Sequence, residues 1–397
     1  MTSTPHHLSR PLVLLFAIAC GTIIASLYYS QPLLATIAHS FGRQPASVGY
    51  LVTLTQIGYA IGLVLVVPLG DALDRRRLIV GLLAASVGAL LIAAMSPGFT
   101  AFAFASVLVG MSSCSAQLLV PFAASLADER QCGRVVGTVM SGLLLGILLA
   151  RTVSGLIAEL AGWRAVYVVA AGLVALLTVA LARALPRDAR DIEFHYGALL
   201  KSLGTLIRKE PALRERSLYG ALAFACFSVF WTGLTFLLSQ PPYGFSEGEI
   251  GAFGLAGAAG ALSAGFAGRL ADRGRGGVAT VLCSGSILLS FALIALGAHS
   301  LVALLAGVLL LDIGVQGLHI SNQSVIYTLA PEMRSRITTV YLTSYFIGGA
   351  AGSSAASVAY AAAGWYGVCL AGAGFAGVLC VWQLARAPRR RLAAQRG

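Results

Sequence analysis

The sequence predicts an all-α membrane protein made of two pseudo-symmetric bundles, each with six transmembrane helices. Three observations predict this class. First, 58% of the 397 residues are hydrophobic and only 11% are charged, whereas a soluble domain has about a quarter charged residues. Second, the apolar residues fall into twelve long runs. Third, short motifs of the first half recur in the same order in the second half.

Each apolar run is long enough for a helix to cross the roughly 30 Å hydrocarbon core of a bilayer. Because every backbone polar group must be hydrogen-bonded inside lipid, we expect all twelve runs to be helical. The first run is too long for the core of a signal peptide. The expected spans are 11–37, 47–69, 78–96, 99–126, 135–160, 163–184, 216–239, 247–267, 278–297, 300–328, 337–361 and 364–385.

Basic residues gather in alternate loops. When both termini are placed in the cytoplasm, all 27 Lys and Arg residues lie on the cytoplasmic side except Arg43, Arg151 and Arg164. The positive-inside rule therefore predicts that both termini are cytoplasmic. This distribution explains the net charge of +12 without a nucleic-acid partner.

One long polar interval separates the first six spans from the last six. We expect an N-terminal bundle at 1–184, a cytoplasmic linker at 185–215 and a C-terminal bundle at 216–397. The middle of the interval, Tyr196 to Arg208, also has the pattern of an amphipathic helix on the membrane surface. A plain linker is the interpretation we prefer.

The two halves share charged and aromatic motifs. GDALDRRR at 70–77 and GRLADRGR at 268–275 follow spans 2 and 8, and Gly162-Trp163 recurs as Gly364-Trp365 at the start of a span, where Trp suits the membrane interface. Two parallel six-span repeats are the architecture of transporters that rock their halves around a central site. The matching loop residues are Gly70, Asp74, Arg75 and Arg77 in the first copy and Gly268, Asp272, Arg273 and Arg275 in the second.

With this loop motif in both halves, the sequence resembles the major facilitator superfamily over essentially its whole length. LYYSQPLL in span 1 and LLDIGVQGLHISNQ in span 10 resemble a bacterial inner-membrane subgroup of its drug:proton antiporter branch. The resemblance implies a monomeric transporter in the bacterial inner membrane that moves a small molecule by alternating access. It implies a proton gradient as the energy source and no cofactor.

The resemblance also implies a gate. Asp74 would meet the start of span 11, near Arg336 to Thr338, where the helix dipole favours an anion. Asp272 would meet the start of span 5 by the same symmetry. The two contacts would hold the cytoplasmic side shut and would break when it opens.

Polar side chains follow one face of spans 4 and 10, which in this family line the cavity together with spans 1 and 7. Steps of four, three and four residues place each set on one helix face. Hydrogen bonding between helices is the alternative explanation, and it stays open for Ser106, Ser113 and Asn322. The two sets are Ser106, Gly110, Ser113 and Gln117 in span 4, and Asp312, Gln316, His319 and Gln323 in span 10.

Three ionisable residues lie within spans: Arg151, Asp312 and His319. Such residues are costly in hydrocarbon and normally face a cavity or a partner. A lone mid-span carboxylate is a natural proton carrier, so we predict that Asp312 carries the coupling proton and that His319 shares it. His319 has no partner set for a metal.

Arg151 departs from the family pattern. The antiporter motif of span 5 would have proline at this place, but residues 150–155 read ARTVSG, and the family's span-4 arginine is replaced by Ser106. We hypothesise that Arg151 supplies the missing cation and pairs with Asp312 or with an anionic substrate. A locked structural ion pair is the alternative.

Spans 1 and 7 contribute aromatic and amide groups. Tyr28, Tyr29 and Gln31 precede Pro32, which should kink span 1, and Ser239-Gln240-Pro241 closes span 7. With Trp231 they suit an amphipathic organic substrate. For the span-7 rings Phe224, Phe227 and Trp231, packing or lipid exposure is the interpretation we prefer. The glycine rows Gly58/Gly62 and Gly348/Gly352 suggest close contacts between the two halves.

The expected function is proton-coupled efflux of a small organic molecule. Proton-coupled uptake is the nearest alternative, because the altered span-5 motif leaves direction open. A membrane-embedded enzyme or receptor is a remote third class, since we identify no catalytic residues. The seven cysteines are scattered, and we expect them to be small apolar residues and not disulfide partners or metal ligands.

Overall fold

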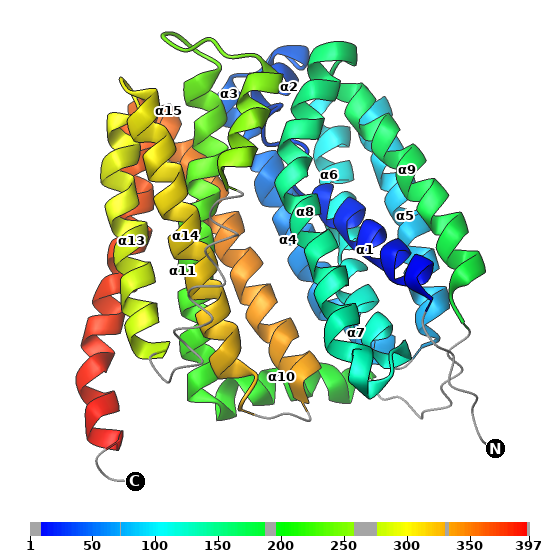
Figure 1. Ribbon diagram of the computed structural model, residues 1–397. Coiled ribbons are helices and arrows are strands. Elements are labelled where there is room, and N and C mark those ends of the chain that lie inside the picture. Colours follow the sequence, from blue (N-terminus) through cyan, green and yellow to red (C-terminus); the bar gives the residue numbers. More distant parts are fainter. Residues whose placement is uncertain (1–8, 72, 187–195, 258–275, 330–332, 395–397) are drawn as a thin grey trace, which may run out of the picture. The chain divides into compact units, whose positions relative to one another are not determined.

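The computed structural model describes residues 9–71, 73–186, 196–257, 276–329 and 333–394, which contain helices and loops and no β-strand (Figure 1). These residues form two compact units. Unit 1 contains those within Met1–Arg43, Leu54–Ser202 and Phe245–Gly254. Unit 2 contains those within Gln44–Thr53, Leu203–Gly244 and Leu255–Gly397.

Unit 1 is formed mainly by the helices of the N-terminal half. Helix α1 packs against α8, and α5 packs against both α6 and α9. The elements are α1 (Arg10–Ala25), α2 (Leu34–Ser40), α4 (Tyr50–Leu65), the 3-10 helix η1 (Val67–Asp71), α5 (Arg75–Met95), α6 (Phe99–Ser113), α7 (Ala116–Leu126), α8 (Glu129–Ala161) and α9 (Trp163–Ala184).

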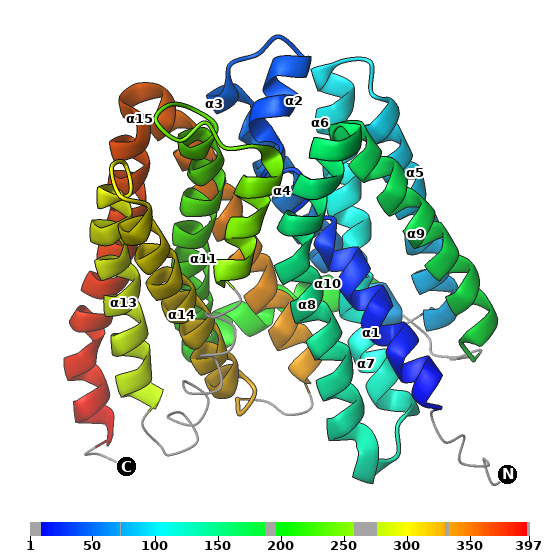
Figure 2. The same ribbon diagram turned by 45° about the horizontal axis from the view of Figure 1, so that its top comes forward.

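Unit 2 is formed mainly by the helices of the C-terminal half. Helix α11 packs along α15, and α13 lies beside α14 (Figures 1 and 2). Helix α15 is bent at Ala363 and Gly364, so its orange arm rises and its red arm returns. The elements are α3 (Pro45–Val48), α11 (Pro211–Leu238), α13 (Gly276–Leu296), α14 (Leu301–Ile326) and α15 (Arg334–Ala394).

Within the described residues, nine helices are long and apolar enough to cross a membrane by length and composition, and α1 is a shorter apolar helix. Helix α9 has the bounds predicted for span 6, and residues 247–257 form the described part of span 8. The amphipathic pattern after residue 195 also forms a helix, α10 (Tyr196–Lys209). The interval predicted as a plain linker is therefore partly helical.

Span 1 is interrupted, as Pro32 predicted. Helix α1 ends at Ala25, residues 26–33 form turns, and α2 begins at Leu34. Proline has no N–H to donate and disfavours helical geometry at the residue before it, so it disfavours a continuous helix at this point. The break places Tyr28, Tyr29 and Gln31 in a buried, irregular segment.

The repeated Gly-Trp pair has one structural explanation in both halves. Gly162 and Gly364 have φ angles of 83° and 57°, values that a residue without a Cβ adopts without strain. The next residue starts a helix arm, and its indole donates to a neighbour: Trp163 to Ser40 Oγ at 2.7 Å, and Trp365 to the Ile294 carbonyl at 3.0 Å. Both tryptophans lie at the predicted starts of their spans, but their rings are buried against protein, so each packs its helix arm onto a neighbouring segment.

The glycine rows pack within one half and not between the halves, which corrects the prediction. A Cβ on Gly58 would collide with the backbone of α6 at Val107. A Cβ on Gly348 or Gly352 would collide with the backbone of α11 at Ala221 or Ala225. Small side chains here allow neighbouring helices of the same unit to approach closely.

Each unit also contains a short segment from the other half of the chain. In unit 2, Thr53 shares hydrogen bonds with Ser353 at 2.8 Å and Ser354 at 3.0 Å. In unit 1, Thr36 donates to the Glu247 carboxylate. Both exchanged segments are thus fixed by hydroxyl groups, and the second one packs against α8 beside the site described next.

Candidate functional site

The buried cation of unit 1 is Arg151, on α8. Its side chain is 4% exposed, its Nε donates to Gln31 Oε1 at 2.6 Å, and its guanidinium lies 4.9 Å from the centre of the Tyr28 ring. A guanidinium over an aromatic face gains cation–π attraction, more so when both are desolvated. The break in span 1 and the centre of span 5 therefore form one site.

The backbone around Arg151 is held by the exchanged segment. Gly251 lies so close that an added Cβ would stand 2.5 Å from the Arg151 carbonyl oxygen. Thr152 Oγ1 donates to the Gly251 carbonyl at 3.0 Å. The position of the cation is thus set from two sides, by the span-1 break and by residues 245–254.

The polar stripe of span 4 is packed within unit 1. Ser113 is fully buried and shares a 2.9 Å hydrogen bond with Ser26, while Gln117 Nε2 donates to the Tyr59 hydroxyl at 3.0 Å. Ser106 donates to the Phe102 carbonyl of its own helix at 2.9 Å. The bond to Ser26 supports the hydrogen-bonding alternative for Ser113, whereas the bond of Ser106 stays within its own helix and does not decide between the two explanations.

The buried acid of unit 2 is Asp312, near the middle of α14 and 3% exposed. Gly257 leaves room for it: a Cβ there would stand 2.5 Å from Asp312 Oδ2 and 3.5 Å from the Trp231 ring. Trp231 and Asp312, both predicted as site residues, therefore border the same glycine. Elsewhere on α14, Gln316, His319 and Gln323 are half-buried.

His319 is the second titratable residue of the α14 stripe. Its Nδ1 shares a 2.9 Å hydrogen bond with the hydroxyl of Tyr341, on α15. Its ring centre lies 4.8 Å from that of Tyr345, one turn further along α15. Sequence reasoning missed both tyrosines, although their four-residue spacing on one helix face was a signal for a pair acting together.

Arg216 is a third residue that sequence reasoning missed, because its position near the end of a polar interval placed it among the cytoplasmic charges. Helix α11 begins at Pro211, which places Arg216 inside the helix and buried at 6% exposure. Its Nη1 donates to Thr280 Oγ1 at 3.0 Å and to Asn322 Oδ1 at 3.3 Å. The arginine thus links α11, α13 and α14, and Asn322 has a role in helix packing.

The aromatic residues of span 7 are buried inside unit 2 and not exposed to lipid. Phe224 stacks on Tyr345, with ring centres 4.1 Å apart and planes 18° apart, and also on Phe227 at 5.4 Å. Trp231 follows at 6.0 Å from Phe227. The rings therefore form a continuous row from Trp231, beside Asp312, to Tyr345, beside His319.

The described copy of the loop motif has a local structural role. Asp74 is the N-cap of α5 and accepts from the backbone N–H of Arg76 at 2.9 Å and of Arg77 at 3.4 Å. Arg75 Nε donates to the Gly70 carbonyl at 3.1 Å. The second copy, with Gly268, Asp272, Arg273 and Arg275, lies outside the described residues.

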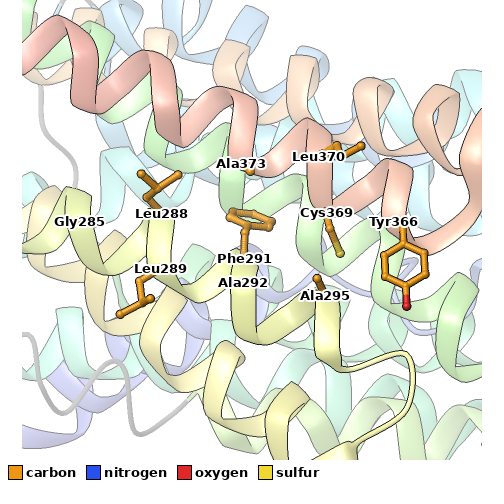
Figure 3. A pocket seen from close by; sticks show the side chains of 10 residues that line it. All are labelled: Gly285, Leu288, Leu289, Phe291, Ala292, Ala295, Tyr366, Cys369, Leu370 and Ala373. Atoms are coloured by element: carbon orange, nitrogen blue, oxygen red, sulfur yellow. The ribbon is translucent and has the colours of Figure 1, made fainter.

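A large groove of about 650 Å³ lies between α13 and the second arm of α15, but it is not the polar site. Figure 3 shows apolar side chains along both helices, with the Tyr366 hydroxyl at one end. Several of its residues, such as Leu289 and Leu370, are exposed. Its lining residues include no Asp, Glu, Lys, Arg or His to orient a polar substrate, so the candidate sites are the clusters around Arg151, Asp312 and His319.

Buried charges on long apolar helices, in two units with matching Gly-Trp corners, define a membrane-spanning transporter. The model of the Major Facilitator Superfamily matches residues 14–353, and the chain belongs to this family. It is a transporter of that type.

Two bacterial relatives are named as transporters. The protein named uncharacterized transporter YgaY of Escherichia coli O157:H7 is 50% identical over 383 residues, covering 96% of this chain and 97% of its own. The protein named probable transporter SCO4007 of Streptomyces coelicolor is 37% identical over 364 residues, covering 91% and 84%.

Solved structures share the fold. The crystal structure of the nucleoside transporter NupG, in a mutant form, has a TM-score of 0.74 at 16% identity and covers 94% of this chain and 99% of its own. A bacterial homologue of the human lysosomal transporter Spinster has a TM-score of 0.75 at 14% identity and covers 97% and 96%. At these identities the similarity concerns the fold alone.

Proposed function

We propose that this transporter exports a small organic molecule across the bacterial inner membrane in exchange for protons. The observation that carries the proposal is Asp312, a carboxylate buried in the middle of the apolar helix α14. A carboxyl group at such a depth is stable when it is protonated or paired, and it exchanges its proton when the surroundings become wet. That cycle is what coupling to a proton gradient requires.

Within this proposal the two units have different tasks. Asp312 and His319 carry the proton in unit 2. Arg151 recognises a negative group, which is either an anionic part of the substrate or the Asp312 carboxylate. The 4.9 Å approach of its guanidinium to the Tyr28 ring and its 2.6 Å bond to Gln31 support this role, because they fix the direction of a desolvated cation.

The proposed substrate is an amphipathic molecule with a ring or another flat apolar part. Tyr28, Tyr29 and Gln31 would bind it in unit 1, and Trp231, Gln316 and Gln323 in unit 2. Ser113 and Gln117 belong to the same proposed set, although their bonds to Ser26 and Tyr59 also serve packing. We further propose that the protein works as a monomer, with both termini in the cytoplasm and no cofactor.

The substrate is first found by screening a panel of toxic and radiolabelled compounds against a deletion strain. The purified protein is then reconstituted into liposomes, and movement of that compound is measured with and without an imposed pH gradient. We expect movement against the concentration gradient only when the pH gradient is present. An equal rate after the gradient is collapsed with a protonophore would contradict proton coupling.

Proton-coupled uptake is the second candidate function. It is favoured by the sequence ARTVSG at 150–155, which replaces the proline-containing motif of the antiporter branch with Arg151. The direction of the pH gradient separates the candidates. Export predicts that substrate moves opposite to the protons in oriented vesicles, whereas a symporter moves both in the same direction.

The gate at the repeated loop remains part of the proposal. Asp74 and Asp272 would each bind the start of a helix of the other half when the cytoplasmic side is closed. Gly70 and Gly268 would allow the tight loops, and Arg75, Arg77, Arg273 and Arg275 would orient the two acids. The contacts of the first copy are compatible with a dual role, because an N-cap uses one face of the carboxylate and leaves its charge in place.

A further inference from the structure

The surroundings of His319 suggest a role for a residue that the proposed transport mechanism has not used. Tyr341 is fully buried on α15, and its hydroxyl lies 2.9 Å from His319 Nδ1 on α14. No hydrogen-bond partner reaches the other ring nitrogen, Nε2, among the residues that the structure describes. Nδ1 of the imidazole is thus occupied by the Tyr341 hydroxyl, whereas Nε2 is available for a ligand or for proton exchange.

Tyr341 is itself fixed by the shape of α11. At Gly220 an added Cβ would stand 2.8 to 3.0 Å from Cε2, Cζ and the hydroxyl oxygen of Tyr341. The glycine therefore provides the space that the phenol ring fills. A fixed phenol holds the imidazole in turn. Because a phenol hydroxyl donates more readily than it accepts, it favours the tautomer in which Nδ1 accepts from Tyr341 and Nε2 carries the proton.

The neighbouring ring has a different relation to the histidine. Tyr345 lies 4.8 Å from His319 between ring centres, with planes 55° apart, and stacks on Phe224. Its contact with His319 is made through the ring face or edge and involves no hydrogen bond. Of these two tyrosines, Tyr341 is the one that contacts the imidazole through a polar atom.

We propose that Tyr341, seated against Gly220, is a positioning residue that holds His319 with Nε2 as its working nitrogen during transport. The inference rests on the proposed function for the task of His319, although the geometry itself does not depend on it. Tyr341 acts through the histidine and is not placed in contact with the substrate. The proposal thus identifies Nε2 of His319 as the atom of the coupling site that exchanges the proton or binds the substrate.

The test uses the full-length protein, labelled with nitrogen-15 in histidine and placed in lipid nanodiscs. His319→Gln identifies the two His319 resonances among those of the six histidines. In the parent protein we expect the Nδ1 and Nε2 shifts to be well separated, as for one dominant tautomer. In Tyr341→Phe we expect them to move toward each other, because both tautomers become populated.

Two further variants complete the test. Tyr345→Phe removes one hydroxyl from the adjacent ring and should leave the His319 resonances where they are. Gly220→Ala displaces the Tyr341 ring and should reproduce the change seen in Tyr341→Phe, so a folded variant remains if the first one fails to fold. Unchanged His319 shifts in Tyr341→Phe, or equal changes in Tyr345→Phe, would overturn the inference. The spectra need neither substrate nor pH gradient, so this failure is distinguishable from failure of proton coupling in liposomes.

Discussion

The tripeptide Ser-Gln-Pro occurs once in each half of the chain and has two different structural outcomes. In unit 1, Ser30-Gln31-Pro32 lies in the break between α1 and α2, and all of its polar side chains are buried. In unit 2, Ser239-Gln240-Pro241 follows the end of α11, and Gln240 is exposed and accepts from the Tyr360 hydroxyl at 3.3 Å. The same residues thus form part of a charge site in one place and a helix end in the other.

The difference shows how each unit accommodates a buried charge. Unit 1 interrupts a helix, so that the amide of Gln31 turns toward Arg151. Unit 2 keeps α11 and α14 continuous and makes space with glycine, at Gly257 beside Asp312 and at Gly220 behind Tyr341. A broken helix supplies polar partners to a cation, whereas a close-packed glycine supplies room for an acid or for the ring that holds a histidine.

The largest effect is expected at the acid of unit 2. Asp312→Asn keeps the size of the side chain and removes the exchangeable proton. We expect substrate accumulation driven by a pH gradient to be lost completely in liposomes, while exchange of labelled for unlabelled substrate continues. Retained accumulation in this variant would show that Asp312 is not the proton carrier.

The next largest effect is expected at the cation of unit 1. Arg151→Ala should lower transport by about 30-fold, because it removes a buried hydrogen bond made by a charged group, worth about 1.5–3 kcal/mol, together with the cation–π contact to Tyr28. Arg151→Lys should not restore the rate, since an ammonium cannot reproduce the planar stacking and the Nε bond. Wild-type rates and an unchanged pH profile in both Arg151→Ala and Asp312→Asn would refute a joint role of the two residues.

The two glutamines provide a matched pair. Gln31→Ala leaves a buried charged donor without its amide acceptor, which costs about 1–3 kcal/mol, so we expect transport to fall by about tenfold at about 1.4 kcal/mol per decade. Gln240→Ala removes the same group from an exposed helix end and should leave the rate unchanged. Initial rates at several substrate concentrations measure both. Equal effects of the two substitutions would remove the distinction between the two tripeptides.

The smallest effect is expected at the loop motif. Two substitutions of Asp74 there distinguish its role as the N-cap of α5 from the role of its negative charge. Asp74→Ala should lower the free energy of unfolding by about 0.5–2 kcal/mol, the usual cost of losing an N-cap, whereas Asp74→Asn still caps α5. Thermal melting of the detergent-solubilised protein compares them. If Asp74 is also part of the gate, Asp74→Asn should transport poorly although it melts and inserts normally. Normal transport by Asp74→Asn would refute the gate.

Several features of the fold could be predicted from local sequence. Helix α9 has the predicted bounds because its apolar run is closed by Gly162 before it and by polar residues after it. Pro32 predicted a kink in span 1, where the structure has a break, and the Gly-Trp repeat marked the start of one helix arm in each half. These predictions depend on properties of single residues, such as the missing N–H of proline and the missing Cβ of glycine, and need no information about distant parts of the chain.

The sequence by itself determined the class of protein, its apolar helices and the buried charges Arg151 and Asp312, because lipid excludes unpaired backbone groups and makes an ionisable residue in mid-span conspicuous. It did not identify Arg216, which lies near the start of its helix. Only the tertiary structure decided the partners: Gln31 for Arg151, Tyr341 for His319, and Asn322 for Arg216. These residues are more than 20 positions apart in the chain, so neither helix periodicity nor motif spacing relates them. Helix packing brings them together, and for that reason the glycine rows also faced neighbours within one half and not across the two.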